Sequence, residues 1–520
     1  MANAKYDHND GGVVVIVGSG AGGGTLANEL CQKGDKVVCL EAGPWLKGPE
    51  LSAKDDFVND EFTMFGKLSG QYFGKTGHPT WLVKAVGGST LHWAGASIRF
   101  KEHEFRTQSV YGGKSGANLL DWPLTLKELE PYYTRAEDKM GVTRTHGIPG
   151  LPGNNNFKVM EAGARKVGYK DVDSGTMAIN SQARDGRPGC LQIGFCFQGC
   201  KSRAKWSTLY VELDKALGTG KLELRPDSQA LQIQHDNSGK VTGVLYVDGQ
   251  GKRVVQKARA VCVAGNSIES PRLLLNSASS QFPDGLANSS GQVGRNFMRH
   301  TTGRVYATFP KPVHMFRGTT MAGVVRDESR NDPSRGFVGG YYLQTLSLGL
   351  PFQALFLKPG AWGAEYTRLL DKYSNMAGMW IVGEDMPQAQ NRVMLDKDAK
   401  DQHGLPVAHL TPFTDHANDV AMRDHAGKAG RAIYEAAGAE DVSVEGPYGS
   451  THNMGTNRMS AKPGDGVCNK WGQAHDVKNL FISDGSQFTT GAACNPTLTI
   501  VALAVRQAEY IHDQMGKGAI

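Results

Sequence analysis

One stretch near the N-terminus, VVVIVGSGAGGGTLANELCQKGDKVVCLEAG (13–43), limits the possible folds of this chain more than any other. It begins with Val13–Val17, a continuous β-branched run that is typical of a parallel strand covered on both faces. Gly18, Gly20 and Gly23 then follow in the spacing GxGxxG. A glycine turn that follows a strand in this way predicts a nucleotide site in an α/β fold.

The residues after the turn complete the pattern. A helix is predicted from about residue 22 to 33, then a strand at Lys36–Leu40 that ends in Glu41. The glycines would let a pyrophosphate approach the helix N-terminus, where free N–H groups and the helix dipole favour an anion. Glu41 is near the usual position of the carboxylate that binds a ribose hydroxyl. The motif by itself leaves NAD and FAD open.

Composition narrows the class of protein. A chain of 520 residues is too long for one ordinary core, so two or more domains are expected. The net charge of +6 is modest, and no block of basic residues is interleaved with aromatics, which argues against nucleic acid as a partner. We find no apolar run of about 18 residues, so the chain itself is not expected to span a membrane, and we find no secretory signal pattern.

Three of the eight cysteines lie within CLQIGFCFQGC (190–200). Cys190, Cys196 and Cys200 have the spacing C-x5-C-x3-C, which is neither a redox CxxC pair nor a zinc knuckle. Zinc would need a fourth ligand, and no histidine lies inside the segment. The other five cysteines are scattered without a disulfide framework, which favours folding in a reducing compartment. Three buried structural cysteines are one interpretation, and thiolate ligands of a metal centre are another.

Six later stretches resemble the signature segments of the glucose–methanol–choline (GMC) oxidoreductases, in the family's order. They are VGGSTLHWAGASIRF (86–100), AGNSIESPRLLLNS (264–277), VGRNFMRH (293–300), NRVMLD (391–396), THNMGTNRM (451–459) and NLFISDGSQFTTGAACNPTLTIVALA (479–504). The resemblance implies FAD as the cofactor. It also implies an α/β fold, with a doubly wound, Rossmann-like FAD-binding domain and an α+β substrate domain built on an antiparallel sheet.

The same resemblance suggests how the chain is divided. The expected parts are a discontinuous FAD-binding domain (1–105, 221–305 and 440–520), an insertion with the cysteine segment (106–220) and a substrate-binding domain (306–439). Within them, residues 223–263 predict a small antiparallel layer, because short alternating runs are separated by turn residues. Helices are predicted at Asp415–Ala437, ended by Gly438, and at Thr497–Tyr510.

The resemblance also assigns the chemistry. His452 matches the family's catalytic histidine and would take the proton of the substrate hydroxyl while a hydride passes to flavin N5. Asn495 matches a position that is His or Asn in the family and would bind the same hydroxyl. Pro496 suits the first turn of the following helix, whose N-terminus would face the flavin. Asn495 acting as the N-cap of that helix is compatible with this role.

Further residues are predicted to contact FAD. They are Gly18, Gly20, Gly23, Glu41, Gly87, Gly88, Thr90, His92, Asp484, Gly485, Asn495, Pro496 and Thr497. His92 stands where some family members attach FAD covalently and others bind it without a bond, so both remain open. His475 is interpreted as structural.

The cysteine segment resembles that of bacterial membrane-associated sugar dehydrogenases within the family, whose catalytic subunit carries FAD and a 3Fe–4S cluster on three cysteines. Several of these have a second cysteine after the first, where this chain has Leu191. The resemblance implies a 3Fe–4S cluster on Cys190, Cys196 and Cys200, with 4Fe–4S as an alternative. It also implies a small companion subunit that carries the export signal, a cytochrome c or other electron acceptor, and a periplasmic location, or a cytoplasmic one if no partner exports the chain.

The resemblance implies oxidation of a hydroxyl of a sugar or glycoside, with a pyranose or glycoside favoured. The position stays open between C1, C2 and C3. Oxidation of gluconate, sorbitol or C1 of glucose by a dehydrogenase of the same family is the closest alternative. Two others are an oxygen-using sugar oxidase with structural cysteines and a flavin-binding scaffold without a substrate. His452 and Asn495 argue against a scaffold, which needs no proton acceptor.

Overall fold

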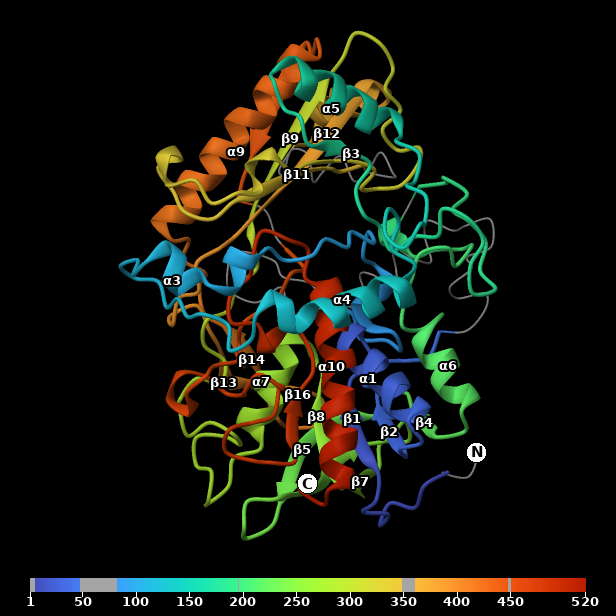
Figure 1. Cartoon of the computed structure of the whole chain (residues 1–520), viewed down its shortest axis with the longest axis vertical. Coiled ribbons are helices and arrows are strands. Elements are labelled where there is room, and N and C mark those ends of the chain that lie inside the picture. The colour runs from blue at the N-terminus through green and yellow to red at the C-terminus, as the bar shows by residue number, and fades with distance from the viewer. Residues whose placement is uncertain (1–4, 47–81, 195, 348–360, 448–449) are drawn as a thin grey trace.

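The computed structural model describes residues 5–46, 82–194, 196–347, 361–447 and 450–520. Two large sheets organise these residues, a parallel one in the lower half of Figure 1 and an antiparallel one in the upper half. Both termini lie beside the lower half. This arrangement confirms the predicted α/β fold with a Rossmann-like part and a part built on an antiparallel sheet.

The parallel sheet has five strands in the order β16-β8-β1-β2-β4. Their bounds are β1 (Val14–Val17), β2 (Val37–Leu40), β4 (Leu222–Arg225), β8 (Ala260–Val263) and β16 (Leu480–Ile482). Ile16 in the middle of β1 pairs with Cys39 of β2 on one side and Cys262 of β8 on the other. Because β1 is paired on both sides, the β-branched run predicted as a covered strand is the centre of the sheet.

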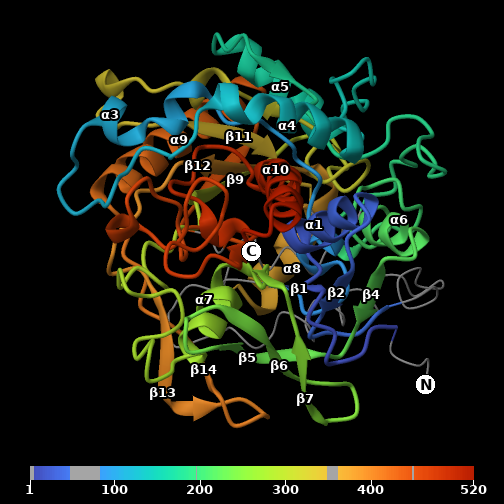
Figure 2. The same cartoon turned by 60° about the horizontal axis from the view of Figure 1, so that its bottom comes forward.

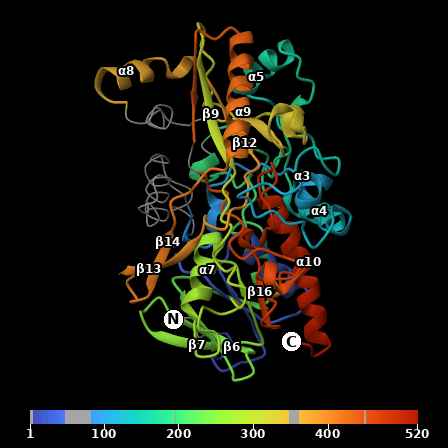
Figure 3. The ribbon, with the colours of Figure 1, turned by 90° about the vertical axis from the view of Figure 1, so that its left-hand side faces the viewer.

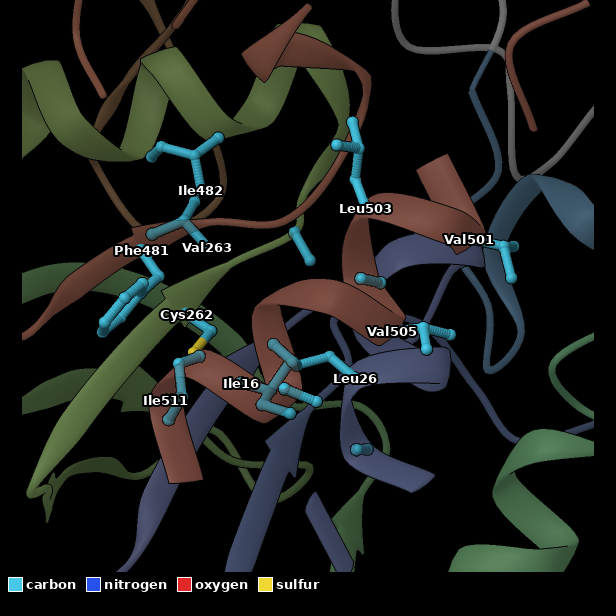
Figure 4. Packing of buried hydrophobic residues seen from close by; sticks show 14 of the residues in the cluster. Ile16, Leu26, Cys262, Val263, Phe481, Ile482, Val501, Leu503, Val505 and Ile511 are labelled. Carbon is cyan, nitrogen blue, oxygen red and sulfur yellow. The ribbon is translucent and has the colours of Figure 1, made fainter. Parts of the chain in front are cut away.

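One face of this sheet is covered by α1 (Ala21–Gln32) and α10 (Thr497–Gly516), which pack against each other, and α4 (Leu126–Met140) packs on α10. Figure 4 shows Ile16 of β1 beside Leu26 of α1, with Val505 of α10 nearby. The predicted bounds of α1 were right to within one residue, whereas α10 continues six residues beyond Tyr510.

The opposite face carries a three-stranded antiparallel sheet in the order β5-β6-β7. Its strands are β5 (Gln229–His235), β6 (Val241–Val247) and β7 (Arg253–Lys257), which together form the antiparallel layer predicted within 223–263. Beside it, helix α7 (Asn266–Asn276) packs against the hairpin of β13 (Val393–Lys400) and β14 (Pro406–Leu410), as Figure 2 shows.

The upper sheet has six strands in the order β15-β9-β12-β11-β10-β3, all antiparallel. They are β3 (Val172–Asp173), β9 (Thr301–Thr308), β10 (Val324–Val325), β11 (Tyr341–Thr345), β12 (Met376–Gly383) and β15 (Asp441–Glu445). Helices α9 (Ala417–Ala436) and α5 (Asn155–Lys166) cover one face (Figure 3). Gly430 allows α9 to approach closely, since a Cβ there would lie 2.7 Å from Val305 Cγ2.

Successive side chains along a strand point to opposite faces of the sheet. Val305 points towards α9, so the side chains on either side of it in β9 point to the other face. Trp380 of β12, paired with Gln344 of β11, belongs to that second face and lines a cavity. The upper sheet therefore presents one face to its helices and the other to the cavity.

In the described ranges, the remaining α-helices are α3 (Thr107–Tyr111), α6 (Glu212–Gly218), which packs on α1, and α8 (Gly363–Asp371), which stands away from the upper sheet in Figure 3. In the described part of the chain, no helix combines the length and apolar character needed to cross a membrane. The domain boundaries stay a prediction. The predicted boundary between residues 305 and 306 falls inside β9, and β15, within the segment that begins at residue 440, pairs with β9 of the upper sheet.

Candidate functional site

A cavity of about 690 Å³ is lined by residues of both halves of the molecule. The glycine turn after β1 contributes one part of its wall, and Trp380 of the upper sheet contributes another. The segments around His92, His452 and Asn495 also reach it. Residues that are hundreds of positions apart in the sequence therefore share one space.

Most residues predicted to contact FAD, and both predicted catalytic residues, line this cavity. They are Gly18, Gly20, Glu41, Gly88, Thr90, His92, His452, Asp484, Gly485, Asn495, Pro496 and Thr497. Gly23 and Gly87 do not line it. A Cβ on Gly23 would lie 2.0 Å from the carbonyl oxygen of Gly18, and Gly87 has a φ of 98°, so both act through the course of the backbone.

The glycine turn has the shape that a pyrophosphate needs. A Cβ on Gly22 would lie 1.6 Å from Ser483 O, which keeps the start of α1 against the end of β16. A Cβ on Gly20 would meet only Gly88 Cα, at 3.9 Å, so this glycine leaves open space at the helix N-terminus. The start of α1 at Ala21 and Gly22 lines the cavity, so the free N–H groups of the first helical turn would favour an anion there. The sequence pattern singled out Gly23 but missed the tight contact of Gly22.

Glu41 stands at the end of β2, as predicted, and is 6% exposed. Its carboxylate accepts hydrogen bonds from Ser19 N at 3.0 Å, Ser19 Oγ at 2.7 Å and Gly43 N at 3.0 Å. Burial raises the pKa of Glu41, and these three donors act against that shift. Hydrogen bonds from Ser19 in the glycine turn and from Gly43 therefore fix the carboxylate at the cavity wall.

His92 follows the 3₁₀ turn at Gly88–Leu91 and is buried. Its Nδ1 lies 2.6 Å from the carbonyl oxygen of Phe197, which can only accept, so Nδ1 carries the hydrogen and Nε2 the lone pair. Burial lowers the pKa of His92 to about 4, which keeps the ring neutral. Thr90 donates to Gly87 O at 2.5 Å and holds the turn closed.

Asp484 also lines the cavity, but its carboxylate already has protein partners. It accepts hydrogen bonds from Asn266 N at 2.8 Å, Ser270 Oγ at 2.5 Å and Ser486 N at 2.8 Å. Burial raises the pKa of Asp484. Its side chain joins the end of β16 to the start of α7, and this contact sets the course of the cavity wall.

The two predicted catalytic residues meet at the cavity. His452 Nε2 lies 3.5 Å from Asn495 Nδ2, and Asn495 Oδ1 accepts a hydrogen bond from Gln344 Nε2 at 2.6 Å. Asn495 directly precedes Pro496, the N-cap of α10, so the helix start fixes its position. Burial, and then the neighbouring His300, lower the pKa of His452 well below its usual value. The ring is therefore a neutral proton acceptor.

Three residues beside this pair were not predicted from the sequence. His300 Nδ1 lies 2.8 Å from His452 Nδ1, the ring of Trp380 lies 5.3 Å from that of His452, and Gln344 holds Asn495. His300 ends the recognised stretch VGRNFMRH, but nothing in that stretch indicates contact with residue 452. Gln344 and Trp380 come from ordinary strands, whose sequence gives no sign of function.

The three clustered cysteines line a second, small cavity of about 30 Å³. Gln192 N lies 3.4 Å from Cys190 Sγ and Lys205 N lies 3.4 Å from Cys200 Sγ, so two sulfurs already accept backbone N–H groups. Burial, and then the nearby Cys196 and Cys200, raise the pKa of Cys190 to about 11. Phe195 lies outside the described residues. Among those described, no group of three or more His, Cys, Asp or Glu side chains is arranged to hold a metal ion.

The two cavities share a wall. Buried Lys205 donates its Nζ hydrogens to the carbonyl oxygens of Leu91 at 2.9 Å, Trp93 at 2.7 Å and Cys196 at 2.6 Å. Phe197, between Cys196 and Cys200, lines the large cavity. The turn that carries His92 is thus joined directly to the cysteine segment.

His475, interpreted as structural, lies away from both cavities and bonds to Ser460 Oγ at 3.1 Å.

Comparison with known proteins identifies the family. Two family models, both described as GMC oxidoreductase, match residues 65–302 and 387–504, which together make up more than half of the chain. The chain belongs to the GMC oxidoreductase family. It is therefore an FAD-dependent oxidoreductase, and FAD, as implied by the resemblance, is the cofactor rather than NAD.

Two curated relatives and one solved structure are similar over nearly the whole chain. The 2-methyl-1,2-propanediol dehydrogenase of Mycolicibacterium austroafricanum is 35% identical, over 96% of this chain and 94% of that protein. The fructose dehydrogenase large subunit of Gluconobacter japonicus is 28% identical, over 97% and 98%. The crystal structure of pyridoxine 4-oxidase from Mesorbium loti has a TM-score of 0.68 at 18% identity, covers 96% of this chain and 99% of that one, and supports the fold.

The residues of this chain fit FAD. The open side of Gly20 at the N-terminus of α1, the carboxylate of Glu41 at the end of β2 and the His452–Asn495 pair all line one cavity. Gly20 would hold the pyrophosphate and Glu41 a ribose hydroxyl, as the sequence predicted. The N-terminus of α10 would favour negative charge on the flavin.

Proposed function

We propose that this chain is the catalytic subunit of an FAD-dependent dehydrogenase that oxidises one hydroxyl of a sugar, a glycoside or a related polyol. One observation carries the proposal. His452 and Asn495 lie side by side in the wall of the cavity that the glycine turn also lines. A neutral imidazole next to an amide donor can hold an alcohol oxygen and take its proton.

The chain's own groups divide the work at the hydroxyl. His452 Nε2 would accept the hydroxyl proton, and Asn495 Nδ2 would donate a hydrogen bond to the same oxygen. Gln344 holds Asn495 Oδ1 at 2.6 Å, which directs the Nδ2 hydrogens towards His452 and the substrate. Bound FAD would supply the two-electron acceptor for the C–H bond that breaks.

Two buried polar atoms favour a substrate with more than one hydroxyl. In the described structure, neither Gln344 Oε1 nor Trp380 Nε1 has a hydrogen-bond partner. The two residues are paired across β11 and β12, so their side chains share a face, and Trp380 lines the cavity. A second hydroxyl that accepts from Trp380 and donates to Gln344 would satisfy both atoms, which otherwise cost about 1–3 kcal/mol each.

The relatives support the same substrate class. One is named for 2-methyl-1,2-propanediol and another for fructose, and both compounds carry hydroxyls on neighbouring carbons. The finer proposal, oxidation at C3 of a glycoside, rests on the resemblance of the cysteine segment, with gluconate, sorbitol and C1 of glucose as alternatives. A panel of glycosides, sugars, sugar acids and small 1,2-diols, mixed anaerobically with the enzyme, tests it. A 3-keto product supports C3, and an aldonic acid or a simple hydroxy-acid contradicts it.

We also propose that Cys190, Cys196 and Cys200 hold a 3Fe–4S cluster, with 4Fe–4S as the alternative. Their three sulfurs border one small cavity and two accept backbone N–H groups, as cluster ligands do. The absence of a metal-holding group among the described side chains speaks against it. Such a cluster would supply one-electron transfer out of the flavin site. Iron and sulfide analysis of anaerobically isolated protein tests for the cluster, and the ratio of iron to sulfide distinguishes 3Fe–4S from 4Fe–4S.

Partners and location follow from that proposal. A small companion subunit carrying the export signal, and a cytochrome c or other acceptor, would make the complex a periplasmic one attached to the membrane through its partners. The relative named as a large subunit is consistent with a companion. Co-purification of a small partner with the chain from its native cells tests this.

An oxygen-using oxidase, in which the three cysteines are structural, is the second candidate, and the raised pKa of Cys190, which keeps this residue a thiol, is compatible with it. Brisk oxygen consumption by iron-free protein with its substrate would support it. Covalent attachment of FAD to His92 is a separate proposal, for which the Nε2 lone pair is suited. Denaturation in acid tests it, because attached flavin stays with the precipitate.

A further inference from the structure

The contact between His300 and His452 follows from the backbone. Met298 and Met454 form an isolated antiparallel bridge, in which each residue's N–H lies 3.0 Å from the other's carbonyl oxygen. Residue 300 comes two positions after Met298, and residue 452 comes two positions before Met454. Because the pairing is antiparallel, these two residues lie opposite each other. Their rings meet at nearly a right angle, with centroids 4.9 Å apart.

His300 is held in an uncommon conformation. Its φ is 66°, in the left-handed region, which costs a non-glycine residue about 1–2 kcal/mol. The backbone is fixed on one side, where Arg299 N donates to Asp385 Oδ2 at 2.7 Å. The side chain is 2% exposed. A buried imidazole held in this way is directed at His452 by its surroundings rather than by free rotation.

The direction of the hydrogen bonds between the two rings can be deduced from one carbonyl group. His300 Nε2 lies 3.0 Å from Gly491 O, which can only accept, so Nε2 carries the hydrogen. Burial lowers the pKa of His300 to about 4, so the ring is neutral and its Nδ1 has the lone pair. His452 Nδ1 must then donate to His300 Nδ1, which leaves the lone pair of His452 on Nε2.

The hydrogen bonds of Asn495 agree with this tautomer of His452. Gln344 Nε2 donates to Asn495 Oδ1, so Asn495 presents its Nδ2 hydrogens to His452 Nε2 at 3.5 Å. The hydrogen bond to Gly491 also places the lone pair of His452 on Nε2. All hydrogen bonds from Gly491 to Gln344 are therefore compatible with one set of tautomers and amide orientations.

We propose that His300 is a positioning residue, which fixes His452 in the tautomer whose Nε2 accepts the substrate proton and shares the positive charge that results. The proposal rests on His452 being the base of the proposed function. When the substrate O–H bond breaks, an N–H bond forms at Nε2 and His452 becomes a cation. Its Nδ1–H then donates to His300, which in turn donates to the Gly491 carbonyl, so two acceptors in series stabilise the charge.

Two variants of the holoenzyme test the proposal by the kinetics of flavin reduction. His300→Leu removes the acceptor, and we expect the limiting rate of flavin reduction to fall about 10²-fold, with the dissociation constant for the substrate nearly unchanged. His300→Asn keeps an oxygen acceptor near the position of Nδ1, and we expect a loss of less than about tenfold. Equal losses in both variants, or a loss seen only in substrate affinity, would overturn the proposal.

A measurement that needs no turnover separates this proposal from the proposed function. Nitrogen NMR of the oxidised holoenzyme with isotopically labelled histidine should show His452 with hydrogen on Nδ1 and none on Nε2, and a mixture of both tautomers in His300→Leu. The His452 signals are those that vanish in His452→Gln. Hydrogen on Nε2 in the native protein would contradict the proposal even if a substrate reduces the flavin. If no substrate does, the proposed function fails while the tautomer result still stands.

His475→Asn is the matched control. His475 is half-buried and hydrogen-bonded to Ser460 but lies on neither cavity. We expect this variant to leave the reduction rate and the His452 signals unchanged. A change equal to that of His300→Leu would mean that loss of any partly buried histidine has this effect, and the proposal would fall.

Discussion

The His452 region and the cysteine segment were predicted from the same resemblance, yet their structures differ. Around His452, side chains from four separate stretches already contact one another at hydrogen-bond distance. Around Cys190, Cys196 and Cys200, the sulfurs border one cavity of about 30 Å³ but are not arranged as a metal site in the described residues.

The difference has a physical reason. His300, Gln344 and Asn495 are fixed by a bridge, a strand and a helix start, so protein contacts alone bring them together. Burial raises the pKa of Cys190, so its thiol keeps its proton, and binding of a cluster would have to release that proton. The first region is thus a site that the fold completes, and the second a site that iron would have to complete.

The largest expected effect comes from the region that the fold completes. His452→Gln removes the proton acceptor but keeps a side chain of similar size, and we expect flavin reduction by the substrate to slow about 10³-fold. The bound FAD should remain, because His452 is not among the residues proposed to hold the pyrophosphate or the ribose. Anaerobic stopped-flow measurement of flavin absorbance gives the rate. A loss below tenfold would show that another group is the base.

The cysteine region should respond in the opposite way. Replacing Cys190, Cys196 and Cys200 together with serine should remove bound iron and electron transfer to an external acceptor, while flavin reduction by the substrate stays unchanged. Cys262→Ser, within strand β8, is the control and should keep the iron. Metal analysis and the two half-reactions measured separately check this. If the wild-type protein contained no iron, the cysteine segment would not be a metal site, and the proposed cluster would be contradicted.

Two glycines of the nucleotide turn sharpen the comparison. Gly22→Ala would place a Cβ 1.6 Å from Ser483 O, which is backbone, so we expect a destabilisation of about 3 kcal/mol or more. Gly20→Ala has open space, with Gly88 Cα as its only neighbour at 3.9 Å. This variant should fold normally but bind FAD more weakly. Denaturant unfolding and flavin titration of both proteins test it; equal stability of the two would contradict the reported packing.

The pH dependence of flavin reduction should be shifted to the acid side. An ordinary histidine with a pKa near 6.5 would lose about 90% of its proton-accepting form at pH 5.5. Burial and His300 lower the pKa of His452, so the accepting form persists as the pH falls. We expect kcat/KM for flavin reduction to fall less than about twofold between pH 7 and 5.5. A tenfold fall would mean that His452 titrates as an exposed histidine does.

The smallest expected effect concerns the second hydroxyl. Trp380→Phe removes one hydrogen-bond donor and keeps the ring beside His452. The KM for a 1,2-diol should rise about fivefold, and that for a simple alcohol of the same length should not change. Equal effects on both substrates would show that Trp380 acts by shape alone.

The sequence predicted the parts that depend on local pattern. β1 and α1 follow from a β-branched run and a glycine turn, and α9 ends at Ala436 just before Gly438, whose φ of 92° suits the predicted stop. Gly18, Gly20 and Glu41 line the cavity because a strand–turn–helix unit fixes their positions. The motifs also brought His452 and Asn495 forward as a pair.

What the sequence did not give depends on tertiary contacts. His300 meets His452 only because Met298 and Met454 pair across 156 positions, and no local pattern reports such a bridge. Gln344 and Trp380 are strand residues whose partners, Asn495 just before α10 and the ring of His452, are far away in the sequence. Lys205, which joins the two cavities through three carbonyl groups, reads in the sequence as an ordinary charged residue.

One measurement tests the central claim most directly, that this chain oxidises a hydroxyl at the cavity bordered by His452 and Asn495. The oxidised holoenzyme is titrated anaerobically with the best polyol of the panel while flavin absorbance is followed. We expect complete bleaching of the flavin with the wild-type protein and persistence of the oxidised spectrum in His452→Gln on the same timescale. Flavin that stays oxidised with every sugar and diol, or bleaches equally fast in both proteins, would contradict it.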